Sequence, residues 1–341
     1  MLCGNCGATL YSSSFIGGTV GAMDATLRLH QSGKCQQSAA PVSIDESRGV
    51  KMGTSTMDAA LMELADEAAE SQVRRNAAIK IGEMRADANL DDVARVVAHL
   101  ANPHNCEVGG SAISVRRAAL LAFTELARGP EGVPFVVASC APAVVELLQH
   151  TDPDAREMAV RALGALGKHA DAIALAARLE DEENDVRAAA SDTLVVVRDT
   201  LGAPDLDAIA LVLRYDGDDE VRAWALRTLG GIGPAAATQS AAVLACLHDE
   251  DTMALTPPSR AIAVATLAAF GRASAASHLP FIAAMLEDAD EDACVRAAAV
   301  EALAQVGEAA IHGEAISELL GDRDRMVRNA ATSALKRWDM Y

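Results

Sequence analysis

The chain has 341 residues, 51% of them hydrophobic but only 3% aromatic, and its 48 Asp and Glu residues outnumber its 29 Lys and Arg residues. The resulting net charge of −19 disfavours nucleic acid as a partner, because binding to phosphates needs clustered positive charge. The sequence has neither an apolar stretch long enough to span a membrane nor a secretory signal, and its seven cysteines are scattered, so we expect a soluble cytoplasmic protein.

Residues 1–56 are rich in Ser, Gly and Thr, contain no repeat, and are expected to form an irregular N-terminal segment. Within this segment Cys3 and Cys6 have C-x-x-C spacing, and His30 and Cys35 follow farther along. Four nitrogen and sulfur donors are the ligand set of a tetrahedral structural zinc site. The long spacer before His30 departs from compact zinc fingers, and a single C-x-x-C is common by chance. The sequence leaves two possibilities, a zinc knuckle or an unliganded tail.

From residue 57 to residue 341 the sequence repeats one block, which we expect to form a second domain. In each block Val is followed by Arg, then by Ala four residues after the Val, and by a large apolar residue eight after it. Six copies keep this pattern: Val73-Ala77-Ile81, Val115-Ala119-Phe123, Val186-Ala190-Leu194, Val221-Ala225-Leu229, Val295-Ala299-Leu303 and Val327-Ala331-Leu335. Two degenerate copies begin at Ala155 and Ser259 and keep the arginine. Self-similarity at this spacing predicts a stacked repeat.

Positions i, i+4 and i+8 share one face of a helix, so each block predicts a helix, which we call helix B. A second helical segment, helix A, precedes each block; examples are residues 91–100, 142–150, 171–179, 205–215 and 280–288. Glycines close several helices B, where left-handed caps are expected: Gly164, Gly167, Gly230 and Gly307. One helical pair cannot bury its own apolar faces, but eight stacked pairs can. The predicted fold is therefore all-α.

The pattern D/E-x-x-V-R-x-x-A-x-x-x-L-G, as in DDEVRAWALRTLGG (218–231), resembles the HEAT repeat. It is most similar to the short repeats of the phycobilisome-lyase and deoxyhypusine-hydroxylase type. The resemblance covers roughly residues 57–341 and implies a right-handed α-solenoid of about eight helical hairpins. It also implies that the arginine is structural and links the start of helix B to acidic groups of adjacent repeats.

An enzymatic role is not expected. Deoxyhypusine hydroxylases bind iron through His-Glu dipeptides, whereas none of the eight histidines here is followed by Glu, so the resemblance does not carry that activity. The chain also lacks the G-x-S-x-G, P-loop and H-E-x-x-H motifs. His312 and Glu314 stand in the tripeptide HGE, which is too short to define a site.

Acidic residues gather in the predicted turns between helices A and B. Equivalent turns align in a solenoid, so these residues would form an acidic ridge along one edge. Capping a helix needs about one such residue in each turn, and these turns contain two to five. The surplus serves either solubility or the attraction of a basic partner. The candidate partner-binding residues are Asp181, Glu182, Glu183, Asp216, Asp218, Asp219, Asp288, Asp290 and Glu291.

Two functions of different classes follow. The first is a non-enzymatic scaffold that binds another protein, with a basic segment of that partner held by the acidic ridge. The second, implied by the phycobilisome-lyase resemblance, is a lyase or chaperone that holds a linear tetrapyrrole or another cofactor on the surface of the helices B. Trp224, Tyr215 and the arginines of the helices B are the candidate ligand contacts for this second function, although packing beside the core is the better explanation of Trp224.

Overall fold

The structure is a computed structural model, and it describes residues 56–101, 114–128, 134–248, 254–276, 278–308 and 311–338. All of these residues belong to one compact unit, Met52–Tyr341, and the other unit, Met1–Lys51, lies outside the described residues. The candidate zinc ligands Cys3, Cys6, His30 and Cys35 therefore lie outside them too. The described residues form helices and no strand, which confirms the predicted all-α class.

Eight helical pairs follow one another along the chain, and we number them repeats 1 to 8. Their helices B are α2 (Ser71–Glu83), α4 (Val115–Ala127), α7 (Pro153–Ala165), α9 (Asn184–Val196), α11 (Asp219–Ile232), α13 (Pro257–Ala269), α16 (Ala293–Gln305) and α18 (Arg325–Trp338). Their unbroken helices A are α1 (Thr56–Ala65), α3 (Leu90–Leu100) and α10 (Ala203–Tyr215).

The other five helices A are divided into two short pieces. They are α5 (Phe135–Ala138) with α6 (Ala141–Leu147), α8 (Ala172–Ala176) with η2 (Ala177–Glu180), η4 (Gly233–Gln239) with α12 (Ser240–His248), α14 (Arg272–Ala275) with α15 (Leu279–Glu287), and α17 (Gly313–Glu318) with η5 (Leu319–Gly321). Two further 3-10 turns, η1 (Gly167–His169) and η3 (Arg198–Thr200), lie between repeats.

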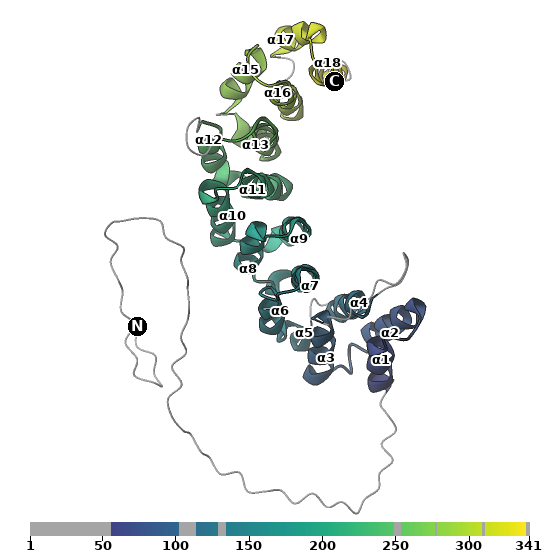
Figure 1. Cartoon of the computed structure of the whole chain (residues 1–341). Coiled ribbons are helices and arrows are strands. Elements are labelled where there is room, and N and C mark those ends of the chain that lie inside the picture. The colour runs from purple at the N-terminus through teal and green to yellow at the C-terminus, as the bar shows by residue number, and fades with distance from the viewer. Residues whose placement is uncertain are drawn as a thin grey trace, which may run out of the picture. The chain divides into compact units, whose positions relative to one another are not determined.

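The repeats stack in chain order. Each helix B lies against the helices B of the neighbouring repeats and against helix A of its own repeat. Figure 1 shows the resulting arrangement, in which the helices B form one layer of the stack and the helices A form the other. The predicted solenoid of eight hairpins is thus confirmed.

The i, i+4 and i+8 side chains of the helices B form the core. All of them are buried except Val73, which is 39% exposed, and Leu335, which is half-buried. These two residues lie in repeat 1 and repeat 8, the first and last described repeats, whose helices B contact one neighbouring helix B each among the described residues. The small Ala at i+4 lets adjacent helices approach closely, and aliphatic side chains fill the narrow space that is left between them.

The glycines of the helices B serve two different purposes. Gly167 and Gly307 have positive φ values of 54° and 80°, which confirms the predicted left-handed turns there. The same prediction is wrong for Gly164 and Gly230, which lie inside α7 and α11. A Cβ atom on Gly164 would lie 3.0 Å from Cγ2 of Thr193 in the next helix B. Such glycines allow neighbouring helices to pack closely.

One stretch of the described residues, Asp219–His248, is long and apolar enough to cross a membrane by length and composition alone. It is not one continuous α-helix, because α11 ends at Ile232 and Gly233 follows with a φ of 74°. In addition, α11 packs between α9 and α13. The buried apolar residues of α11, among them Val221, Leu226 and Leu229, belong to the core of the stack.

Candidate functional site: the acidic edge

Arg328 of repeat 8 donates to carbonyl oxygens of its own turn, but in repeats 2 to 7 the arginine after the first core position of helix B bonds to the following repeat. Five of these arginines pair with a carboxylate of that repeat, at nitrogen–oxygen distances of 2.6 to 3.1 Å. We call them the arginine ladder: Arg116–Asp152, Arg156–Asp181, Arg187–Glu220, Arg260–Glu291 and Arg296–Asp322. The predicted structural role of the arginine is confirmed.

The second pair of the ladder, Arg156–Asp181, shows how a buried arginine is held by its carboxylate. Nε and Nη2 of Arg156 donate hydrogen bonds to the two carboxylate oxygens of Asp181, at 2.9 and 2.8 Å. The two side chains are only 6% and 2% exposed. Burial by itself would raise the pKa of Asp181. The hydrogen bonds from Arg156 and from the backbone N–H of Glu183, together with the charges of Arg156 and Arg178, outweigh burial and lower that pKa below its ordinary value.

Repeats 5 and 6 are joined by a different contact. Asp219 accepts hydrogen bonds from the hydroxyl groups of Thr256 at 2.6 Å and of Ser259 at 2.7 Å, both in repeat 6. Burial raises the pKa of Asp219, but these two hydroxyl groups, the backbone N–H of Thr256 and the charge of Arg222 together lower it by more, so the pKa lies below its ordinary value. Ser259 replaces the Val of the repeat pattern and is itself buried, so its hydroxyl group has a structural role.

The nine residues of the predicted ridge fall into three groups. Three bind side chains that join repeats: Asp181, Asp219 and Glu291. Three accept backbone N–H groups within their own turn: Asp216, Asp218 and Asp288. The remaining three are exposed, Glu182, Glu183 and Asp290, although Glu182 also accepts a hydrogen bond from Arg156 at 3.2 Å. The first group is held by the fold and is poorly placed for a partner.

The exposed carboxylates of the turns, with that of Asp185 in the first turn of α9, constitute the surface that a partner can reach. We call them the acidic edge: Glu182, Glu183, Asp185, Asp218, Asp288 and Asp290. Close to them, burial and the neighbouring charge of Asp216 raise the pKa of Glu180. Carboxylates of adjacent repeats are therefore near enough to repel one another, and a cation at this edge would relieve that repulsion.

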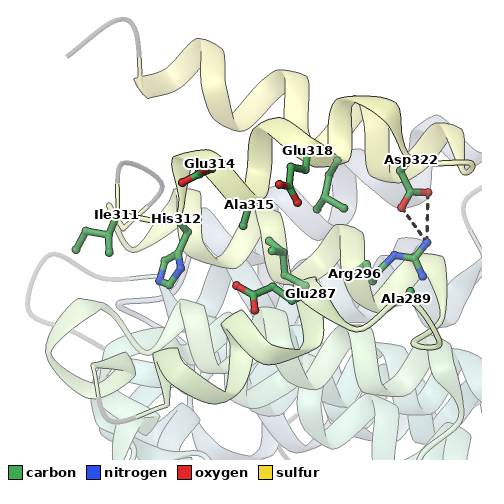
Figure 2. Close-up of a pocket in the computed structure, with 11 residues that line it drawn as sticks. Glu287, Ala289, Arg296, Ile311, His312, Glu314, Ala315, Glu318 and Asp322 are labelled. Atoms are coloured by element: carbon green, nitrogen blue, oxygen red, sulfur yellow. Dashed lines mark hydrogen bonds and ion pairs between the residues drawn. The ribbon is translucent and has the colours of Figure 1, made fainter.

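A pocket of about 560 Å³ lies beside this edge, between repeats 7 and 8. Glu287 at the end of α15 lines one side, and Glu314 and Glu318 of α17 line the other (Figure 2). The ladder pair Arg296–Asp322, with oxygen–nitrogen distances of 3.3 and 3.1 Å, closes one end. In the described part of the chain the three glutamates form no ion pair with a basic side chain.

These three glutamates were not among the predicted site residues. Glu287 belongs to an acidic run, but Glu314 and Glu318 lie within a helix A, where the turn-based argument does not apply. Aligning the sequences of the helices A with one another could have identified these glutamates. That alignment requires the ladder acids as reference points.

The candidate contacts of the tetrapyrrole hypothesis are engaged within the protein. Nε1 of Trp224 donates a hydrogen bond to Oδ1 of Asn184 at 3.1 Å, and the guanidinium of Arg227 lies 4.9 Å from the centre of a Trp224 ring. Tyr215 is exposed and lies beside Arg214. Within the described residues no group of three or more His, Cys, Asp or Glu side chains is arranged to hold a metal ion.

Comparisons with known proteins agree with this architecture. A family model described as HEAT repeats matches residues 108–194 and 252–336. Among solved structures, Kap121p is similar over 83% of this chain and 33% of its own, with 12% identity and a TM-score of 0.52. Importin beta is similar over 82% and 42% of the two chains, with 15% identity and a TM-score of 0.49.

Human deoxyhypusine hydroxylase, solved with glycerol, is similar over 84% of this chain and 96% of its own, with 20% identity and a TM-score of 0.32. The chain thus spans about a third of the length of Kap121p and less than half that of importin beta. A search of curated proteins with the sequence finds no match.

Proposed function

The chain belongs to the HEAT-repeat family, and from this premise we propose that it is a non-enzymatic scaffold that binds a protein partner. The partner contributes a basic segment, and the acidic edge receives it. The repeat architecture supports a role in protein interaction in general, since stacked helical pairs present a long continuous surface. The proposal includes a cytoplasmic location, for which the odd, scattered set of cysteines is the supporting feature.

The observation that carries the proposal is that some acidic residues of the turns are bound within the protein while others in the same turns are exposed. Asp181 and Glu291 already pair with arginines of the preceding repeats, yet Glu183, Asp185 and Asp290 are exposed in the same two acidic runs. These additional carboxylates are not needed for the ladder. An exposed row of like charge accelerates and orients the approach of a cationic segment.

The proposal is tested with charge-matched variants and a fluorescently labelled oligolysine peptide. The edge variant is Glu183→Gln/Asp185→Asn/Asp290→Asn, and the control is Glu83→Gln/Asp192→Asn/Glu301→Gln, whose residues are also exposed but lie beyond the first turn of their helices B. We expect the edge variant to bind about tenfold more weakly at low salt and the control to differ from the parent protein by less than about twofold.

The parent protein should also lose affinity as the salt concentration rises, because exposed charges are screened. Equal losses in the two variants would show that only net charge matters and would refute the acidic edge. Binding that does not change with salt would refute an electrostatic contact altogether.

A further inference from the structure

We propose that the open end of repeat 8 binds an acidic segment of a protein partner, and that this segment also contributes an apolar side chain. Four residues carry the inference, and we call them the end face: Leu320, Arg325, Arg328 and Lys336. They lie in η5 and α18, the last described helices of the stack (Figure 1). The end face is separate from the acidic edge and has the opposite charge, so the inference goes beyond the proposed function.

Contacts within the inner repeats show which positions of a repeat face the next one. Two residues before the first core position, Asn184 accepts a hydrogen bond from Trp224 of the next repeat, and Asp219 accepts two from hydroxyl groups of repeat 6. One residue after the core position, the ladder arginines reach forward. Nine residues after it, a Cβ atom on Gly164 or Gly230 would lie 3.0 or 3.2 Å from a threonine of the next helix B. In repeat 8 these three positions are Arg325, Arg328 and Lys336.

Leu320 is the apolar part of the end face. In repeats 1 to 7 the last leucine in or directly after helix A is 0 to 2% exposed, and these leucines are Leu64, Leu100, Leu148, Leu179, Leu213, Leu247 and Leu286. Leu320 has the same place in repeat 8 and is 45% exposed. In repeat 4 the turn η2, which contains Leu179, lies against α10 and α11 of the next repeat. Among the described residues no such repeat covers Leu320.

The other three residues of the end face are cations that lack a carboxylate. Nη1 of Arg328 donates to the carbonyl oxygens of Asp322 and Arg323, at 2.8 and 2.9 Å, but in the described part of the chain Arg328 forms no ion pair. Arg325 and Lys336 are exposed and form none there either. The helix that carries all three, α18, contains no acidic residue. Positive charge therefore collects at the end of a chain whose net charge is −19.

The inner repeats also show what chemistry fills this place. In the ladder a carboxylate lies in front of each arginine, and it comes from the turn before the next helix B or from the first turn of that helix. Asp152 at the N-cap of α7 and Glu220 in the first turn of α11 are examples. The buried leucines at the ends of the helices A belong to the apolar core. A segment with carboxylates beside an apolar side chain would supply both contacts to the end face.

Lys336 argues against a second copy of this chain as the occupant. The other seven repeats have a smaller residue at this position, namely Gly82, Thr124, Gly164, Val195, Gly230, Ala268 and Ala304. Those residues let the next helix B approach closely, and a lysine side chain there would prevent a further repeat from stacking at the same distance. A lysine can instead reach a carboxylate of a segment that lies farther from α18. The end face therefore fits an acidic segment better than another helical pair.

The test measures the binding of three fluorescently labelled peptides of equal length to the full chain. The first peptide repeats Glu-Glu-Leu, the second has Ala in place of Leu, and the third has Gln in place of Glu. At about 0.15 M salt, charges more than about 8 Å apart are largely screened, so the net charge of the chain contributes little. We expect the Glu-Glu-Leu peptide to bind about tenfold more tightly than the Gln peptide and about threefold more tightly than the Ala peptide.

The end-face variant is Arg325→Gln/Lys336→Gln, and the control is Arg85→Gln/Lys168→Gln, which removes the same charge from exposed residues outside the end face. Arg328 is kept in both because it also holds its own turn. We expect the end-face variant to bind the Glu-Glu-Leu peptide about tenfold more weakly and the control to differ from the parent by less than about twofold. Thermal unfolding of both variants should stay close to that of the parent.

A third variant, Leu320→Ala, should bind the Leu and Ala peptides with equal affinity. If it still prefers the Leu peptide as strongly as the parent does, the apolar contact is overturned. Equal losses in the end-face variant and the control would overturn the end face, and a parent that binds the Glu and Gln peptides equally would overturn the acidic partner. Oligolysine binding should not weaken in the end-face variant, so this inference and the proposed function fail independently.

Discussion

Arg156 illustrates how a charged side chain becomes part of a hydrophobic stack. It donates to both oxygens of Asp181, and its Nη1 donates to the carbonyl oxygen of His150 at 3.0 Å, so almost all of its donors are satisfied inside the protein. A buried ion pair of this kind contributes modestly while it is intact. Removing one member is costly, because the other charge stays buried without its partner.

Replacing Arg156 by Ala should therefore lower the free energy of unfolding by about 3 kcal/mol, measured by urea denaturation followed by far-ultraviolet circular dichroism. Arg161 is the control, because its side chain is 52% exposed and its partner Glu157 lies on the same helix. The Arg161→Ala variant should lose about 0.5 kcal/mol or less. Similar losses in the two variants would mean that the ladder pair is no stronger than a surface ion pair.

The sequence predicts the ladder arginines, but it does not predict which acidic residues pair with them and which are exposed. Asp181 and Glu183 stand two residues apart in the same acidic run, and nothing in that run distinguishes them. In the structure Asp181 is buried against Arg156 while Glu183 is exposed. The difference arises from the neighbouring repeat, which is distant in sequence, and for this reason the predicted ridge contained both kinds of residue.

At the scale of helices, the distance between consecutive helices B depends on small residues at their contacts. A Cβ atom on Gly82 of α2 would lie 2.2 Å from Cβ of Glu125 in α4, and one on Gly231 of α11 would lie 2.6 Å from Cγ2 of Val195 in α9. Both distances are too short for real atoms, so the helices would have to move apart. Glycine lowers helix propensity at these positions, and close packing compensates for that loss.

The variant Gly82→Ala should therefore be destabilised by about 1 to 3 kcal/mol, although Ala favours a helix more than Gly does. The control is Gly217→Ala, because a Cβ atom there would meet no other atom within 4 Å. We expect that control to change the unfolding free energy by less than about 0.5 kcal/mol, as is usual for surface substitutions. A Gly82→Ala protein that is more stable than its parent would show that α2 and α4 can separate freely.

Sequence periodicity predicted the register of the helices B well, because i, i+4 and i+8 are fixed by the geometry of one helix. It predicted the helices A less completely. The segment predicted at residues 171–179 is an α-helix only over Ala172–Ala176 and continues as a 3-10 turn to Glu180. That turn brings Asp181 to Arg156 of the preceding repeat, a contact that local propensity cannot indicate.

At the scale of the whole stack, the terminal repeats differ from the inner ones on their outer faces. Lys80 of α2 is exposed at the position where α4 has the buried Ala122, which packs in the stack. Thr332 of α18 is half-buried where α16 has the buried Val300. Polar residues at these positions make repeats 1 and 8 caps, and solenoids need such caps to stay soluble.

A stack in which each repeat contacts only its neighbours should open from its ends. We expect amide hydrogen exchange to be slowest in α9 and α11 and to become faster toward α1 and α18. The variants Leu194→Ala and Ile81→Ala are matched, because both residues are fully buried at the i+8 position of a helix B. Each removes a similar apolar volume and should cost about 2 to 5 kcal/mol locally.

The two variants should nevertheless differ in which helices show faster amide exchange. Ile81→Ala should accelerate exchange in α1 and α2 and leave α9 to α18 unchanged, because repeat 1 has a neighbour on one side only. Leu194→Ala should accelerate exchange in α9 and in both neighbouring helices B, α7 and α11, because repeat 4 couples two parts of the stack. Equal acceleration of every helix by both variants would mean that the eight repeats unfold as one cooperative unit, and a nearest-neighbour description would then be wrong.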